Sequence, residues 1–306
     1  MVDRAFVHYQ PHWEWVVREF PPNQLDAYRV EARLRTTDPD PGNVVILGDS
    51  TALASLDPFV FEGIFPERHF VPITIGGSNT VSFGFLANAI LAIDAKAAIL
   101  VVSPYGTRDQ INYAGVNVYD VRAAPSLFTR DEVLAEPNFH LMGLAAQSHV
   151  LIRHRWVLQQ SLRVYLETAD WAELRRGYMR GRLRAMRQGD FGPIVGWMRS
   201  TDPVAYPNPN TRAIRYLARR MRENDGVLVL MESPVHPLMS LLVSAARTAP
   251  FREYMETIAR EEGLVFITNE DLPELKVEYF ADQSHMNAVG SALVTQVVAA
   301  RLHDVL

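Results

Sequence analysis

Five short segments of the chain consist almost entirely of apolar residues, and turn-forming or polar residues bound each of them. Continuous apolar runs of this length are typical of parallel strands that are buried on both faces. The predicted strands are residues 44–47, 70–75, 97–103, 226–233 and 264–269. Segments of helical length, such as 82–95 and 251–263, alternate with them. This alternation predicts an α/β fold with a doubly wound, mainly parallel sheet.

The alternation stops in the middle of the chain. No strand-like run occurs between residues 106 and 222, and the apolar spacing within 140–190 predicts helices instead. We therefore predict a single domain over 1–306, with a helical N-terminal lead-in over 1–43 and a helical insertion over 106–222.

The amino-acid composition excludes several kinds of site and argues against one class of partner. The 306 residues include no cysteine, which excludes disulfides, thiolate metal sites and a cysteine nucleophile. The formal net charge of −5 argues against nucleic acid as a partner of the whole molecule. Basic residues are concentrated in 151–222, where 15 Arg and 5 acidic residues give a local charge of +10. Two explanations stay open: these arginines recruit a partner or substrate, or they form solvated faces packed against acidic ones.

The sequence leaves the compartment open. No stretch reaches the roughly 18–20 apolar residues that span a bilayer, and no signal-peptide pattern follows Met1. The opening residues 2–20 are aromatic-rich and amphipathic. The protein is therefore cytoplasmic, or its chain begins after a removed anchor.

The strongest chemical signal is Gly48-Asp49-Ser50, directly after the first predicted strand. Ligands of open α/β sheets bind at the carboxyl ends of the strands. A serine at the start of the next helix meets free backbone N–H groups, which stabilise an oxyanion. The alternative is that the serine only caps the helix.

A serine nucleophile needs a base, and the base needs an orienting group. The segment 281–285, ADQSH, provides both, because Asp282 can hold Nδ1 of His285 and leave Nε2 free for the proton of Ser50. Alternatively, Asp282 or Ser284 caps the last predicted helix and His285 has no catalytic role. The predicted apolar face of that helix comprises Val289, Leu293, Val297 and Ala300.

These two motifs, in this order, resemble the first and last sequence blocks of the SGNH (GDSL-type) hydrolases. The resemblance covers roughly residues 44–110 and 226–306. It implies a flavodoxin-like three-layer fold and a catalytic triad of Ser50, Asp282 and His285.

The family's second block is a glycine turn whose backbone N–H completes the oxyanion hole. The segment ITIGGSNT resembles it, with Gly77 as the first candidate donor and Gly76 as the second. An ordinary Gly-Gly turn is the alternative. Thr51 stands where the full GDSL motif has leucine, a position that we expect to pack rather than to react.

The third block departs from the family pattern of Gly-x-Asn-Asp. Aligning GTRD on this block places Arg108 in the position of the asparagine, and Asn112 is a second candidate. An arginine can donate to an oxyanion and attract an anionic or polar substrate. The alternative is a surface arginine.

The long lead-in, the altered third block, the helical insertion and Leu56-Asp57-Pro58 after the first block are similar to the cell-envelope branch of this superfamily. That branch includes alginate O-acetyltransferase-like and D-alanyl-lipoteichoic-acid biosynthesis-like proteins. The resemblance implies a periplasmic or cell-surface location, an acyl ester or acylated carbohydrate as substrate, and a membrane-bound acyltransferase as a partner.

Two function hypotheses follow. The first is a serine-dependent ester hydrolase or O-acyltransferase; the second is a weak or inactive protein of the same fold that recruits an anionic polymer or partner. The histidines show no metal-ligand spacing, so we predict no metal and no cofactor. His236, after the fourth predicted strand, lines the site or belongs only to a rigid Pro-flanked loop.

Overall fold

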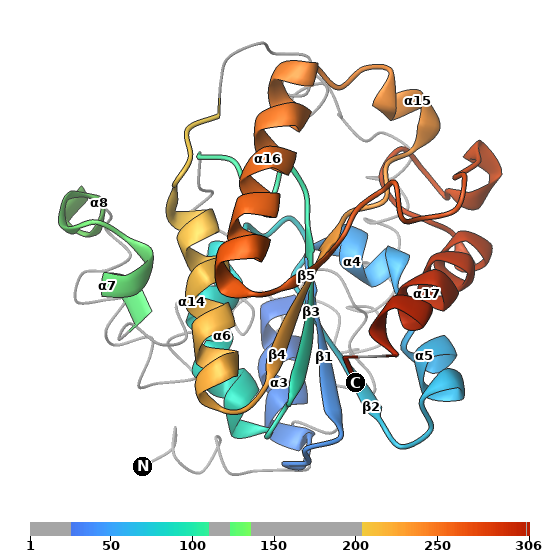
Figure 1. Ribbon diagram of the computed structural model, residues 1–306. Coiled ribbons are helices and arrows are strands. Elements are labelled where there is room, and N and C mark those ends of the chain that lie inside the picture. The colour runs from blue at the N-terminus through green and yellow to red at the C-terminus, as the bar shows by residue number, and fades with distance from the viewer. Residues whose placement is uncertain (1–25, 110–122, 136–203, 304) are drawn as a thin grey trace, which may run out of the picture.

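A five-stranded, all-parallel sheet forms the centre of the computed structural model, which describes residues 26–109, 123–135, 204–303 and 305–306 (Figure 1). The strand order is β2-β1-β3-β4-β5. The strands are β1 (Asn43–Gly48), β2 (His69–Thr74), β3 (Ala97–Val102), β4 (Val227–Glu232) and β5 (Val265–Ile267). The five predicted strands and the parallel α/β sheet are therefore confirmed.

Helices cover both faces of the sheet, which makes a three-layer arrangement (Figure 1). One face carries α3 (Asp26–Thr36), α6 (Val81–Ala92), α14 (Pro209–Glu223) and α16 (Ala245–Glu262). The other face carries α4 (Ser50–Ser55), α5 (Pro58–Ile64) and α17 (Ala288–Leu302). Four shorter elements lie outside these layers: α7 (Ala124–Leu127), α8 (Arg130–Ala135), α15 (Pro237–Ser240) and the 3₁₀ helix η4 (Val277–Tyr279).

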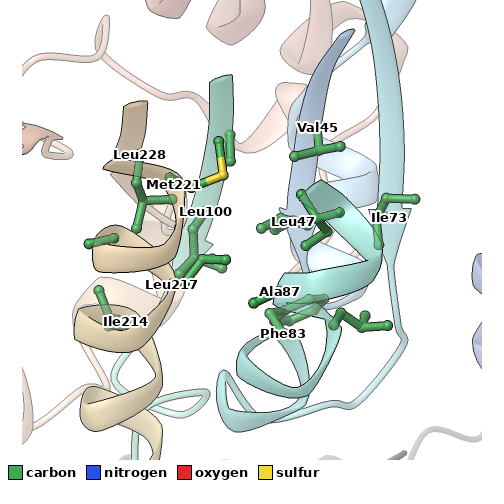
Figure 2. Close-up of a cluster of buried hydrophobic side chains, with 14 of the residues drawn as sticks. Val45, Leu47, Ile73, Phe83, Ala87, Leu100, Ile214, Leu217, Met221 and Leu228 are labelled. Carbon is green, nitrogen blue, oxygen red and sulfur yellow. The ribbon is translucent and has the colours of Figure 1, made fainter. Parts of the chain in front are cut away.

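Successive residues of β1 belong to two different hydrophobic cores. Val45 and Leu47 join the core under α6 and α14, which also holds Phe83 (Figure 2). Val44 and Ile46 join the core under α4, α5 and α17. Because successive strand residues point to opposite faces, a strand buried on both sides must be apolar throughout. Polar chemistry is consequently confined to the ends of the strands.

The end of the predicted insertion belongs to the framework of the sheet. Residues 209–223 form α14, which packs against α6 and β4. The short helices α7 and α8 also fall within the predicted 106–222 segment. Residues 110–122 and 136–203 lie outside the described residues, as do residues 1–25 of the predicted lead-in. No helix in the described ranges combines the length and the apolar character needed to cross a membrane.

The arginines of α14 are balanced by acidic side chains. Their ion pairs are Arg212–Glu132, Arg215–Glu261, Arg215–Glu262, Arg219–Glu223, Arg220–Glu223 and Arg222–Glu262. The acidic partners come from α8, α16 and α14 itself. This part of the basic segment therefore matches the alternative in which arginines pack against acidic faces, whereas Arg175–Arg187 lie outside the described residues.

The last predicted helix is present as α17, but its predicted buried face is wrong. Val289 is 65 % exposed, whereas Val294, Thr295 and Val298 are fully buried. The helix packs against α4 and α5, where the hydroxyl of Thr295 accepts a hydrogen bond from the N–H of Asp57 at 2.9 Å. A polar residue thus belongs to the buried face, and counting apolar positions alone misplaced it.

Phe61 of α5 offers a test of the packing on this side of the sheet. Its ring stacks on that of Phe70 with 4.5 Å between the centroids, and Phe61 is fully buried. We expect Phe61→Ala to lower the free energy of unfolding by about 3–5 kcal/mol, measured by urea denaturation. Phe59 of the same helix is 81 % exposed, so Phe59→Ala should change stability by less than about 0.5 kcal/mol. Equal losses from both variants would contradict this packing.

Candidate active site

The turn between β1 and α4 requires a glycine. Gly48 has φ of +148°, and a Cβ there would lie 2.5 Å from the Cβ of Ala52 and 3.1 Å from the carbonyl oxygen of Val101. This backbone conformation is one that L-residues rarely adopt. Gly48 thus allows the chain to leave the sheet sharply, and Ser50 becomes the first residue of α4 at the carboxyl edge.

Asp49, not Ser50, caps helix α4. The Asp49 carboxylate accepts a hydrogen bond from the N–H of Thr51 at 2.8 Å. The hydroxyl of Ser50 instead lies 2.8 Å from Nε2 of His285. The alternative in which this serine only caps the helix therefore does not describe the structure.

Ser50, His285 and Asp282 form a continuous chain of hydrogen bonds. Nδ1 of His285 lies 2.8 Å and 2.9 Å from the two carboxylate oxygens of Asp282, and Nε2 faces the hydroxyl of Ser50. An ionised carboxylate can only accept, so Nδ1 carries the ring proton and Nε2 accepts from Ser50. The structure thus brings together the three residues that the two sequence motifs pair.

The loop that carries Asp282 and His285 is held by its own backbone. The N–H groups of Ser284 and His285 each donate to Oδ1 of Asp282 at 2.9 Å. The N–H of Ala281 donates to the carbonyl oxygen of His285 at 2.8 Å, which closes the loop. These bonds orient the carboxylate before any substrate binds.

Asn287 caps helix α17 and leaves Asp282 free for His285. Its side-chain oxygen accepts from the N–H groups of Val289 and Gly290 at 3.0 and 3.1 Å. The alternative in which Asp282 or Ser284 caps this helix therefore does not hold.

The environment of Asp282 keeps its carboxylate ionised. Burial alone raises the pKa of this carboxyl group, but hydrogen bonds from the His285 ring and from the N–H groups of Ser284 and His285 outweigh it. The pKa of Asp282 is therefore held well below its usual value of 3.8. An ionised Asp282 favours the tautomer of His285 that can accept a proton at Nε2.

Gly77 lies in the turn after β2, the strand that pairs with β1. Gly48 pairs with Thr74 in the parallel register of β1 and β2, and the N–H of Ile75 donates to the carbonyl oxygen of Gly48 at 3.0 Å. The turns after these two strands are consequently neighbours. Gly77 has φ of +67° and open space where a Cβ would be. Gly76, the second candidate, directly precedes it in this turn.

The second and third family-like blocks are joined through Gly106. Its carbonyl oxygen accepts hydrogen bonds from the N–H and hydroxyl of Thr80 at 3.2 and 3.3 Å, and from the amide of Asn79 at 3.4 Å. Asn79 is buried, with 2 % of its surface exposed. This connection was not predicted, because no local pattern shows that one loop donates to a carbonyl oxygen 27 residues away in another loop.

Arg108 is held by its own loop. Its guanidinium donates to the carbonyl oxygen of Tyr105 at 2.6 Å and lies 3.7 Å from the centroid of the Tyr105 ring. Among the described contacts, none joins Arg108 to Ser50, His285 or Gly77. Its role at the oxyanion stays a prediction, and Asn112 lies outside the described residues.

His236 is 8 % exposed and caps α15. Its Nδ1 accepts from the N–H of Leu238 at 3.1 Å, so the proton of the neutral ring lies on Nε2. The centroids of the His236 and Phe280 rings lie 4.8 Å apart in an edge-to-face arrangement, just before the segment that carries Asp282. His236 thus packs against the start of the loop that carries Asp282 and His285. Within the described ranges, no three His, Asp or Glu residues are grouped to hold a metal ion.

Comparisons with known proteins do not assign a family. No family model and no curated protein matches the sequence. Among solved structures, the crystal structure of TesA matches with a TM-score of 0.44 and 11 % sequence identity, over 86 % of this chain and 99 % of that one. A likeness at this level assigns no activity, so the function must be argued from the geometry above.

Replacing Gly48 tests the geometry of the turn between β1 and α4. We expect Gly48→Ala to cost about 2–5 kcal/mol in thermal unfolding, because backbone strain adds to overpacking against Ala52. At Gly63, within α5, an added Cβ would meet no atom within 4 Å, so Gly63→Ala should leave stability unchanged or raise it by about 0.5–1 kcal/mol. A Gly48 variant as stable as wild type would contradict the close approach.

The lowered pKa of Asp282 predicts a pH-dependent contribution to stability. A carboxylate whose pKa is depressed by folding stabilises the protein fully above its unfolded value of 3.8, and this stability is lost as the pH falls toward the folded value. We expect Asp282→Asn to be less stable than wild type at neutral pH, with a difference that shrinks as the pH falls below 3.8. Urea denaturation at a series of pH values measures it. A difference that does not change with pH would contradict the prediction.

Proposed function

We propose that this protein catalyses serine-dependent acyl chemistry on ester substrates. The observation that carries the proposal is the contact of 2.8 Å between the hydroxyl of Ser50 and Nε2 of His285, continued through Nδ1 to Asp282. A nucleophile, a base and an orienting group within hydrogen-bond distance are the combination that acyl transfer requires. Its place at the carboxyl edge of a parallel sheet adds support.

In the proposed reaction, Ser50 Oγ attacks the acyl carbonyl carbon while His285 takes its proton. The leaving alkoxide then receives that proton from His285, and the acyl group stays on Ser50 as an ester. A water molecule or an acceptor hydroxyl then gives its proton to His285 and attacks the acyl carbonyl carbon. Ser50 Oγ leaves with the proton from His285, and the acyl group is released on the acceptor. Asp282 stabilises the imidazolium that forms in both halves.

The oxyanion needs donors beside Ser50. The N–H of Ser50 begins α4 and therefore has no acceptor within the helix. The N–H of Gly77, on the neighbouring turn, is the second proposed donor. Two such donors facing the developing charge contribute a large part of the rate in acyl transfer.

The substrate that the sequence resemblance favours is an acylated carbohydrate of a cell-envelope polymer, outside the cytoplasm, with a membrane-bound acyltransferase as partner. Water as the acceptor makes the protein an esterase, and a sugar hydroxyl makes it an O-acyltransferase. Incubation with an activated acyl ester, with and without an oligosaccharide acceptor, separates these two reactions by mass spectrometry of the products.

A fluorophosphonate probe tests the proposed nucleophile. We expect covalent labelling of Ser50 in the wild-type protein and none in Ser50→Ala. His285→Ala should lower hydrolysis of a p-nitrophenyl ester by about 10³-fold or more. His69→Ala serves as the matched control, since His69 also pairs with a carboxylate, that of Glu62 at 3.0 Å, but stands at the opposite end of β2 from the site. A folded wild-type protein that the probe fails to label would refute the proposed function.

A further inference from the structure

Thr51, the residue directly after Ser50, has a hydroxyl group that is bonded on both sides. Its Oγ1 donates to Oδ1 of Asp49 at 2.7 Å and accepts from the hydroxyl of Ser233 at 3.0 Å. The Asp49 carboxylate can only accept, and each hydroxyl has one proton, so the chain runs from Ser233 through Thr51 to Asp49. Thr51, which we expected to pack rather than to react, is therefore also held by hydrogen bonds on both sides.

Ser233, the first donor of this chain of hydroxyl groups, is held in place by its backbone. It directly follows β4 and is 7 % exposed. Its N–H donates to the carbonyl oxygen of Val102 at 2.8 Å, and its own carbonyl oxygen accepts from the amide of Asn269 at 3.1 Å. Ser233 is thus tied to the ends of β3 and β5, and the chain ties Thr51 to all of them.

Helix α4 needs such an anchor. It has only six residues, and helices of this length are not stable by themselves. The two neighbours of Ser50 in the chain, Asp49 and Thr51, both belong to the hydroxyl chain. Asp49 accepts hydrogen bonds from both the N–H and the hydroxyl of Thr51. His285, by contrast, reaches Ser50 from a separate loop before α17. The two halves of the triad therefore meet correctly only if the start of α4 is fixed relative to the sheet.

We propose that Thr51 is a positioning residue, which holds Ser50 in its reactive orientation through the hydroxyl chain from Ser233 to Asp49. The proposal rests on the proposed function, in that Ser50 must be the nucleophile. Two substitutions test the hydroxyl of Thr51 separately from the shape of its side chain. Valine has nearly the same shape as threonine but has no hydroxyl group that could continue the chain. Serine has the hydroxyl without the extra methyl group.

Saturation kinetics of fluorophosphonate labelling measure the maximal rate and the probe affinity separately. We expect Thr51→Val to lower the maximal labelling rate of Ser50 by about 10–100-fold, the effect of small misplacements of a reacting group, with an unchanged apparent affinity. Thr51→Ser should recover most of the rate. Ser233→Ala should lower the rate in the same direction, and the double variant Thr51→Val/Ser233→Ala should be no slower than Thr51→Val, because Ser233 acts through Thr51.

A matched control is available on α16. The hydroxyl of Thr257 bonds to the carbonyl oxygen of Glu253 at 2.9 Å, and Thr257→Val should label like wild type.

Labelling of Thr51→Val at the wild-type rate would overturn the positioning role while Ser50 stays the nucleophile. A Thr51→Ser variant as slow as Thr51→Val would overturn it too, since shape would then matter and not the hydroxyl. If Thr51→Val unfolds, Ser233→Ala decides, because it leaves the bonds between Thr51 and Asp49 intact. An unlabelled wild-type protein refutes the proposed function itself.

Discussion

The parallel pairing of β1 between β2 and β3, with helices on both faces, is the constraint on which the other features depend. A strand enclosed in this way accepts only apolar side chains, and Val44 to Leu47 are fully buried. Polar groups can appear only where the strand ends. Gly48 ends it with a backbone conformation that few other residues adopt, and so delivers Asp49, Ser50 and Thr51 to the edge of the sheet. Register with β2 then brings the Gly77 turn alongside.

Helices α4 and α17, beside the candidate site, have their own capping residues, which leaves the side chains of the proposed triad for other contacts. Asp49 caps α4, and Asn287 caps α17. Because Asp49 and Asn287 satisfy those helix ends, the hydroxyl of Ser50 and the carboxylate of Asp282 are not needed there, and both contact His285. On both loops a residue outside the proposed triad therefore satisfies the helix end, and local stability and the proposed chemistry do not compete for the same atoms.

Continuous apolar runs predicted all five strands, and in the central strands β1 and β3 burial on both faces explains why every residue of the run is apolar. The pairing of Ser50 with Asp282 and His285 was also predictable, since both motifs stand directly beside regular elements. The buried face of α17 was not, because Gly290, Ser291 and Thr295 are small or polar and apolar counting passes over them. The contact of Thr51 with Ser233 joins positions 182 residues apart. No local pattern shows such a contact, so only the fold reveals that the hydroxyl of Thr51 is occupied.

The electrostatic effect of α14 is another property that the sequence alone does not show, because the fold places acidic side chains beside its arginines. By sequence, residues 151–222 carry +10, but the arginines of α14 face Glu132, Glu261 and Glu262 as soon as α8 and α16 are placed beside them. Pairing at close range cancels most of the electrostatic field that these arginines would exert at a distance. At an ionic strength of about 0.1 M, the remaining field decays over a Debye length of about 10 Å. Moreover, α14 covers one face of the sheet, whereas α4 and α17 cover the other. Within the described part of the chain, Ser50 and Thr51 are hydrogen-bonded to His285, Asp49 and Ser233, and the ion pairs of the α14 arginines involve none of these residues.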